Sequence, residues 1–193
     1  MSFDWHTIWE FLSKQDYPAW IQAIGSVAAI VYAVRISRSS INHAASEKRK
    51  TIFAIAEAAH THACNIRKAI DVMAWNSGNN IQIYSVYDKT IIEGVVKALQ
   101  GVPMHELGSS KAVIAMLSLT DQMVFLGSSV EILLQGPERH PELGKTLENS
   151  YRDDYEKRQE LAASGYSVLQ YNVRVHLNKI DQDYEALKES LRG

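Results

Sequence analysis

The chain has 193 residues, of which 46% are hydrophobic and 22% are charged, so it is long enough for one domain with its own core. Its formal net charge of −2 provides no general basic field to attract nucleic acid, so we do not expect it to bind nucleic acid directly. The single cysteine, Cys64, excludes an internal disulfide and agrees with a reducing compartment. Proline (4) and glycine (10) are scarce, which favours helices and predicts an all-α fold.

Residues 1–16 predict a short amphipathic segment at a membrane–water interface. On a helix, Trp5 and Trp9 share one face with Ile8 and Leu12. Indole rings suit an interface because they are part apolar and part polar. The alternative is a short helix packed on the protein's own core. The acidic start and the late onset of the apolar run differ from a secretory signal peptide.

Residues 17–35 predict a transmembrane helix. No charge lies between Asp16 and Arg35, and the apolar residues occur on all sides of the helix. The run is long enough for a bilayer, and Trp20 and Tyr32 place aromatic rings near its two ends. The alternative is the most buried helix of a soluble protein.

The charges on either side of this run predict its orientation. Three acids and one lysine precede it, whereas basic residues dominate after it: Arg35, Arg38, Lys48, Arg49 and Lys50. Because cytoplasmic flanks collect basic residues, we expect the N-terminus outside and residues 36–193 in the cytoplasm. The same basic residues are expected to meet lipid headgroups, which makes membrane lipid a partner.

Small residues form a stripe on the predicted span. Gly25, Ala29 and Ala33 recur every four residues, and Gln22 lies close to the same face. Such a stripe lets helix backbones approach closely in lipid, and a glutamine can hydrogen-bond across the contact. The stripe therefore predicts self-association into a homo-oligomer; ordinary alanine-rich composition is the alternative.

Residues 36–193 predict a helical bundle. The first helix runs from 17 to about 75, or breaks near 38–42. A loop at 76–80 precedes a helix at 86–100, where Ser85 and Asp88 have capping-box spacing; a strand at 81–87 is the alternative. Further helices are expected at 110–135, 143–163 and 166–192, with loops at 101–108 and 136–144 and a break at Ser164-Gly165.

Residues 112–134 are a second apolar run of membrane length. Asp121 and Gln122 lie near its middle and Glu131 near its end. An acid at the bilayer centre costs about 2.5–3.5 kcal/mol on insertion scales. We therefore interpret the run as the core helix of the soluble domain, with a two-span hairpin as the alternative.

The helix at 166–192 is coiled-coil-like. Its apolar residues follow 4, 3, 4, 3, 4 spacing: Val173, Leu177, Ile180, Tyr184, Leu187 and Leu191. They predict either the core face of a bundle helix or a seam for a protein partner.

No pattern of residues indicates catalysis. The chain has no phosphate-binding glycine loop, no nucleophile elbow and no zinc-protease motif. His60 and Cys64 share a helix face while His62 points away, and two ligands do not make a zinc site. We therefore expect no enzymatic activity, no metal and no cofactor.

The stretch WIQAIGSVAAIV, residues 20–31, with an acidic, Trp-bearing start before it, resembles a recurrent type of bacterial and prophage membrane protein. These proteins have one N-terminal span and a helical cytoplasmic part, and some are membrane-anchored effectors of anti-phage systems, including retron systems. The resemblance implies an effector or accessory protein of the bacterial inner membrane that perturbs the membrane in phage defence. The alternatives are a membrane-anchored scaffold or sensor, and a soluble helical enzyme.

Overall fold

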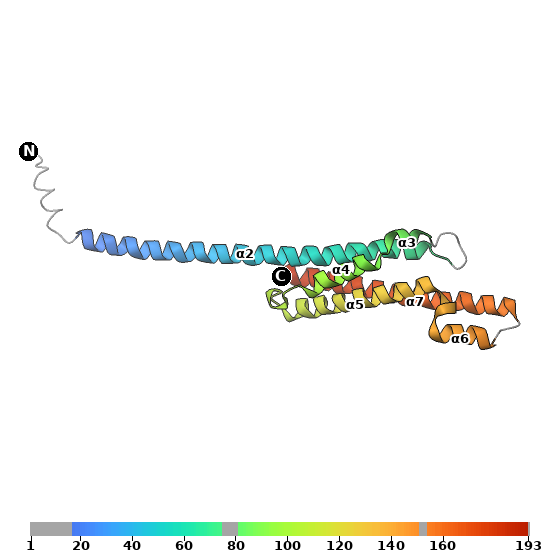
Figure 1. The fold of residues 1–193 in the computed structure, drawn as a ribbon. Helices are drawn as coiled ribbons and strands as arrows, with labels where there is room; N and C mark the ends of the chain where they lie inside the picture. Colours follow the sequence, from blue (N-terminus) through green and yellow to red (C-terminus); the bar gives the residue numbers. More distant parts are fainter. Residues whose placement is uncertain (1–16, 75–80, 151–153, 193) are drawn as a thin grey trace, which may run out of the picture. The chain divides into compact units, whose positions relative to one another are not determined.

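A computed structural model describes residues 17–74, 81–150 and 154–192 of the chain. All regular secondary structure in these ranges is helical, which confirms the all-α class (Figure 1). The helices are α2 (Tyr17–Val72), α3 (Ile81–Val86), α4 (Lys89–Gln100), α5 (Ser110–Gln135), α6 (Pro141–Ser150) and α7 (Tyr155–Arg192), with 3₁₀ turns η2 (Met104–Glu106) and η3 (Pro137–Arg139). The chain divides into two compact units, Met1–Glu47 and Lys48–Gly193.

Helix α2 begins at Tyr17, as the sequence predicts, and continues to Val72 without the alternative break near 38–42. Pro18 suits the first turn because the backbone N–H that it lacks would have no helical partner there. At the other end, the side-chain amide of Gln170 donates to the carbonyls of Ile70 (2.7 Å) and Met73 (3.2 Å). These bonds satisfy carbonyls that the end of a helix leaves open. The predicted loop at 76–80 lies outside the described residues.

The structure corrects the sequence interpretation around residues 81–100. Residues 81–86 form a helix, so the alternative of a strand at 81–87 is wrong. Helix α4 starts at Lys89 rather than at Val86, because Asp88 is its cap: Asp88 is extended and accepts from Thr90 N at 2.7 Å. The hydroxyl of Ser85 instead donates to the carbonyl of Gln82 within α3.

Helix α5 has the predicted bounds. Ser109 caps its first turn by accepting from Ala112 N at 3.1 Å, and Gly136 ends it with a φ of 79°. A positive φ favours glycine, so the residue that follows the helix is suited to stop it. Ten α5 residues are buried, which fits the interpretation of 112–134 as a core helix.

The predicted break at Ser164-Gly165 is wrong. Helix α6 ends at Ser150, and α7 runs unbroken from Tyr155 through Gly165 to Arg192. Asp154 starts α7 by accepting from Lys157 N at 3.1 Å. A Cβ on Gly165 would lie 3.1 Å from Cβ of Pro137. Glycine therefore serves close packing against η3 here rather than a turn.

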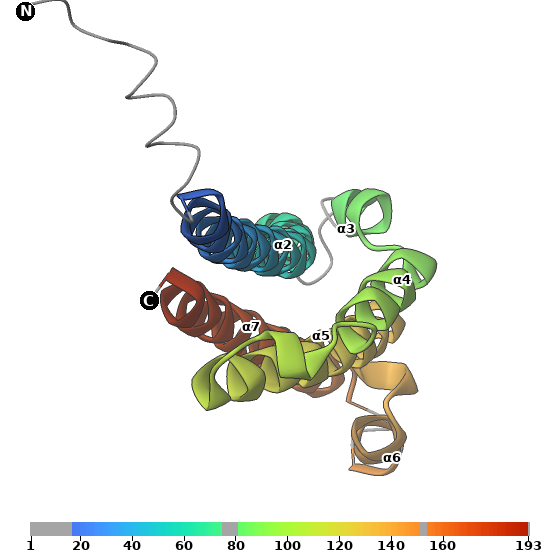
Figure 2. The ribbon, with the colours of Figure 1, turned by 90° about the vertical axis from the view of Figure 1, so that its left-hand side faces the viewer.

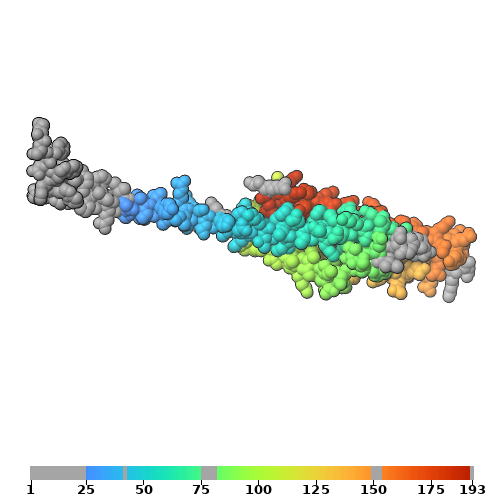
Figure 3. All heavy atoms as spheres, turned by 90° about the horizontal axis from the view of Figure 1, so that it is seen from above, coloured from blue at the N-terminus to red at the C-terminus, as the bar shows by residue number. Residues whose placement is uncertain are grey.

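The unit Lys48–Gly193 has one hydrophobic core. Figure 2 shows α5 and α7 side by side, with α4 against α5. The last part of α2 lies over this pair and adds its buried residues to the same core. Seen from above, the same part of α2 lies beside the C-terminal part of α7 (Figure 3). The largest fully buried side chains belong to these helices and the segments that join them: Ile66, Ile70, Ile83, Leu99, Leu107, Met116, Leu119, Met123, Leu126, Leu133, Leu177 and Ile180.

Candidate functional sites

The first candidate site is an exposed apolar segment in α2. Every residue from 25 to 40 is exposed. Six large apolar side chains are among them: Val27, Ile30, Val31, Tyr32, Val34 and Ile36, each between 46% and 68% exposed. Successive residues of a helix are about 100° apart, so these six side chains cover all sides of it. An apolar surface that surrounds a helix is costly in water.

The predicted association stripe lies open on this segment. Gly25, Ala29 and Ala33 are exposed, and a Cβ added to Gly25 would meet no atom within 4 Å. The side chains of Gln22 and Trp20 lie outside those that the structure describes, as do Trp5, Trp9 and the predicted interfacial segment 1–16. The stripe is therefore accessible to a helix from another copy of the chain.

The five predicted headgroup residues divide into two groups. Arg35 and Arg38 are exposed near the end of the apolar segment. Lys48 and Arg49 are also exposed, but they contact their own domain: Lys48 Nζ lies 2.7 Å from Glu106 Oε1. The Arg49 guanidinium covers Gly108, where an added Cβ would lie 2.8 Å from Nη2. Lys50 is exposed as well.

The predicted partner seam of α7 lies in the core. Its first five residues are buried and Leu191 packs partly buried against the same cluster: Val173, Leu177, Ile180, Tyr184, Leu187 and Leu191. The structure thus supports the core-face alternative and corrects the interpretation as a surface for another protein. The 4, 3 spacing arises because α7 packs against neighbouring helices of its own chain, which demands the same periodicity as a coiled coil.

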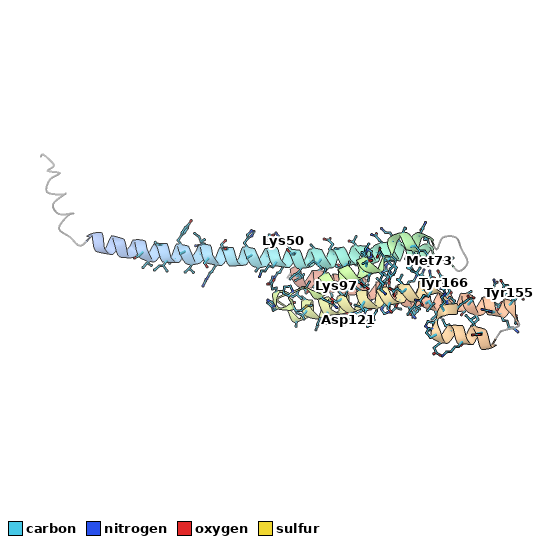
Figure 4. All side chains as sticks on the ribbon, viewed as in Figure 1. Lys50, Met73, Lys97, Asp121, Tyr155 and Tyr166 are labelled. Carbon is cyan, nitrogen blue, oxygen red and sulfur yellow. The ribbon has the colours of Figure 1, made fainter. Side chains whose placement is uncertain are left out.

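The second candidate site is a polar cluster on α2 and α7, which we call the His60–Cys64–Asp181 cluster. His60 Nε2 lies 3.1 Å from Asp181 Oδ1 and 3.7 Å from Cys64 Sγ. The three donor atoms lie within 4.8 Å of one another. Figure 4 labels Lys50 on α2 and Met73 just after its end; His60 and Cys64 lie between these two positions in the sequence, and Asp181 lies on α7.

Two neighbours hold the cluster in place. The imidazole of His60 stacks on the ring of Tyr184, with centroids 4.1 Å apart and planes 5° apart. Arg67 donates to Asp181 Oδ2 at 2.7 Å and to Asn178 Oδ1 at 2.8 Å. The guanidinium therefore fixes one carboxylate oxygen and leaves the other facing His60 and Cys64.

The bonding pattern of the cluster excludes one chemistry. In a nucleophile–histidine–carboxylate relay, the thiol and the carboxylate bond to different ring nitrogens. Here Cys64 and Asp181 both approach Nε2 of His60. This geometry does not form a proton relay.

Sequence reasoning identified His60 and Cys64 but missed Asp181. The aspartate lies 121 residues beyond His60 and comes from a different helix. The spacing of His60 and Cys64 on one helix face can be recognised in the sequence. The position of Asp181 beside them depends on how α2 and α7 pack, which the sequence does not show locally. His62 is not one of the residues whose donor atoms converge in the cluster, and burial lowers its pKa from 6.5.

Two other polar groups have structural partners. Asp183 is buried and accepts from Ser118 Oγ at 2.5 Å and from Lys179 Nζ at 2.6 Å. Tyr87 donates to the carbonyl of Gly127 at 3.0 Å, and burial, reinforced by the charge of Glu131, raises its pKa. Both arrangements tie α5 to a neighbouring segment and need no ligand.

The described residues contain one helix that is long and apolar enough to cross a membrane by length and composition, and it is α5. The core helix of a soluble protein meets the same test, and α5 has ten buried residues. This test does not support the predicted span at 17–35.

No protein-family model, no curated protein and no solved structure matches this chain.

Proposed function

We propose that this chain is a membrane-anchored protein whose span is residues 17–35 and whose helical domain lies on the cytoplasmic side. The observation that carries the proposal is the exposed apolar surface around α2 from Val27 to Val34. Burial of such a surface is worth about 25 cal/mol per Å², and lipid can cover every side of a helix at once.

The assignment of the span to α2 rather than α5 rests on charge and packing. Helix α5 carries Asp121 near its middle and buries ten residues against its own domain. Residues 25–34 carry no charge and are all exposed. Inserting α5 would place a carboxylate in lipid at about 2.5–3.5 kcal/mol and would expose the core of the domain.

If residues 17–35 anchor the chain, we propose that it acts as a non-enzymatic effector or accessory protein of the bacterial inner membrane. The open stripe of Gly25, Ala29 and Ala33 supports self-association of the span. Clustered spans would perturb the membrane, and the resemblance to membrane-anchored anti-phage effectors suggests phage defence as the setting.

Fractionation tests the anchor. We expect the full chain to sediment with bacterial membranes, to resist alkaline carbonate and to be released by detergent. In spheroplasts, a C-terminal tag should be protected from protease and an N-terminal tag should be cleaved, because the basic flank is expected inside. Recovery in the soluble fraction without detergent would remove the anchor.

A pair of matched variants tests the role of the stripe. Ala29→Leu adds bulk on the stripe, whereas Val27→Leu adds one methylene on the far side of the helix. Ala29→Leu should reduce cross-linking between copies and the dye-reported loss of membrane potential on expression; Val27→Leu should change neither. Membrane potential and growth that stay normal even when the wild-type chain is overexpressed with the suspected phage trigger would contradict the effector role.

A membrane-anchored scaffold is the second candidate. It is favoured by apolar side chains that remain exposed on α5 and α7: Ile114, Leu117, Val124, Phe125, Val168, Tyr171 and Val175. The scaffold predicts that Phe125→Glu abolishes recovery of a partner while fractionation stays unchanged. The effector predicts that the same variant retains its effect on membrane potential.

A further inference from the structure

We propose that His60, Cys64 and Asp181 form a binding site for one divalent transition-metal ion, with Zn²⁺ as the best fit. Imidazole nitrogen, thiolate and carboxylate are the three kinds of protein ligand that zinc accepts. The softer thiolate disfavours Mg²⁺ and Ca²⁺, which prefer oxygen ligands. The site is independent of the membrane anchor proposed above.

The distances between the donor atoms suit a tetrahedral ion. With zinc bonds of about 2.0–2.3 Å, tetrahedral angles place neighbouring ligand atoms roughly 3.4–3.6 Å apart. The distances from His60 Nε2 are 3.1 Å to Asp181 Oδ1 and 3.7 Å to Cys64 Sγ. All three atoms lie within 4.8 Å of one another, so shifts of a few tenths of an ångström to about 1 Å complete the arrangement.

The convergence on one nitrogen is what a shared ion requires. Nε2 has a single in-plane direction, so it cannot hydrogen-bond well to Cys64 and Asp181 together. An ion placed among the three atoms gives each of them a full bond in its own direction. The arrangement that fails as a proton relay therefore fits coordination.

The surroundings support the ligands in the way metal sites need. His60 and Cys64 are one turn apart on α2, which sets their spacing. Stacking on Tyr184 fixes the imidazole plane, and Arg67 binds the carboxylate oxygen that faces away from the cluster. Such outer partners orient ligands and tune the metal.

The ligand charges match a divalent ion. A thiolate and a carboxylate together neutralise it, and Arg67, which pairs with Oδ2 of Asp181 at 2.7 Å, adds one positive charge beside the site. The side chain of His60 is 23% exposed and that of Asp181 is 44% exposed, so an ion can enter from solvent. The fourth position remains for water, the pattern of an open site rather than a closed structural one.

Binding would join α2 to α7 through one ion. Because the three ligands come together only in the folded domain, the ion stabilises that fold and raises its melting temperature with concentration.

Co²⁺ and Zn²⁺ titrations of the full chain in detergent, after removal of metal, test the site. Cys64 is the single cysteine, so a thiolate-to-cobalt absorption band in the near ultraviolet reports on it alone. We expect saturation at one ion per chain, displacement by Zn²⁺ and a higher melting temperature with Zn²⁺. No band at millimolar Co²⁺, or one ion per two chains, overturns the proposal.

Variants separate this site from adventitious binding. Cys64→Ser should abolish the band, and His60→Gln and Asp181→Asn should each weaken Co²⁺ binding by at least about tenfold. His105→Gln, at an 83% exposed histidine, is the matched control and should bind as the wild type does. Melting without metal checks that each variant folds. Cobalt affinity unchanged in both folded His60→Gln and Asp181→Asn overturns the three-ligand site; if Asp181→Asn does not fold, His60→Gln decides alone.

Discussion

Two parts of helix α2 use apolar residues in different ways. From Gly25 to Ser40 every residue is exposed, and large apolar side chains occur on all sides. From Lys48 onward the buried residues form one stripe with three- and four-residue spacing: Ile52, Ala56, Ala59, Ala63, Ile66, Ala69 and Ile70. The second pattern belongs to a helix that packs on one side of a protein core; the first does not.

Pairs of small residues in the two parts of α2 also differ in their exposure. Ala59 and Ala63 are four residues apart and are buried in the core of their own chain. Gly25 and Ala29 have the same spacing and are exposed. Small residues let helices approach closely in both settings, but among the described residues only the second pair is buried in a core. The comparison supports the proposal that lipid and another copy of the chain cover the first part.

The largest expected effect comes from removing side-chain volume in each part. Ile66 is fully buried, so Ile66→Ala should lower the free energy of unfolding of the domain by about 2–5 kcal/mol. Ile30 is 63% exposed, so Ile30→Ala should change it by less than about 0.5 kcal/mol. Denaturant unfolding of the full chain in detergent, followed by circular dichroism, measures both. Equal losses would mean that the two parts share one core.

A charge in each part should affect location differently. Val31→Arg places a cation in the proposed span at a cost of about 2.5–3.5 kcal/mol, which should move most of the chain out of the membrane fraction. Thr61→Arg places the same cation on the exposed face of the second part and should leave the chain in the membrane. Quantitative fractionation compares them. Retention of Val31→Arg in carbonate-washed membranes would argue against residues 17–35 as the span.

Arginines in the two parts should also differ. Arg67 makes two charge-assisted hydrogen bonds to α7, but it is partly exposed, so Arg67→Met should cost about 1 kcal/mol of domain stability. Arg38 is exposed in the first part, and Arg38→Met should leave domain stability unchanged. Unfolding with a chelator present keeps metal out of the comparison. A loss in Arg38→Met as large as that in Arg67→Met would contradict this difference.

Local signals predicted much of the fold. The start of α2 at Tyr17 and both ends of α5 follow from proline, a serine cap and a glycine, all of which act within one or two turns. The prediction of a break at Gly165 was wrong because this glycine allows close packing against Pro137, which is distant in sequence. The seam of α7 was ambiguous because its spacing is the same against its own chain and against a partner.

The polar cluster could be predicted only in part. His60 and Cys64 were visible as a pair on one helix face, because helix geometry fixes their spacing. Asp181 joins them through the packing of α2 against α7, which depends on the buried residues of both helices. No local pattern distinguishes this aspartate from the other acids of α7.

The smallest expected effect is a pH dependence that arises in the second part of α2. Burial lowers the pKa of His62 below 6.5, and its Nε2 has no hydrogen-bond partner within the described residues. Burial also lowers the pKa of His176 on α7. Between the folded and unfolded pKa values, the unfolded chain binds more protons, so stability falls as pH drops from above 6.5 through the lowered folded pKa values.

The pH dependence of the melting temperature between about pH 7.5 and 5.5 measures this effect, because the unfolded histidine pKa lies inside that window. His62→Leu removes one titrating group from a partly buried position, so its melting temperature should fall less with acid; the slope that remains belongs in part to His176. His43→Leu removes an exposed histidine that lies between the two parts and should keep the wild-type slope. If His62→Leu keeps the wild-type slope while His43→Leu flattens it, burial of His62 is not the source of the acid dependence, and this prediction fails.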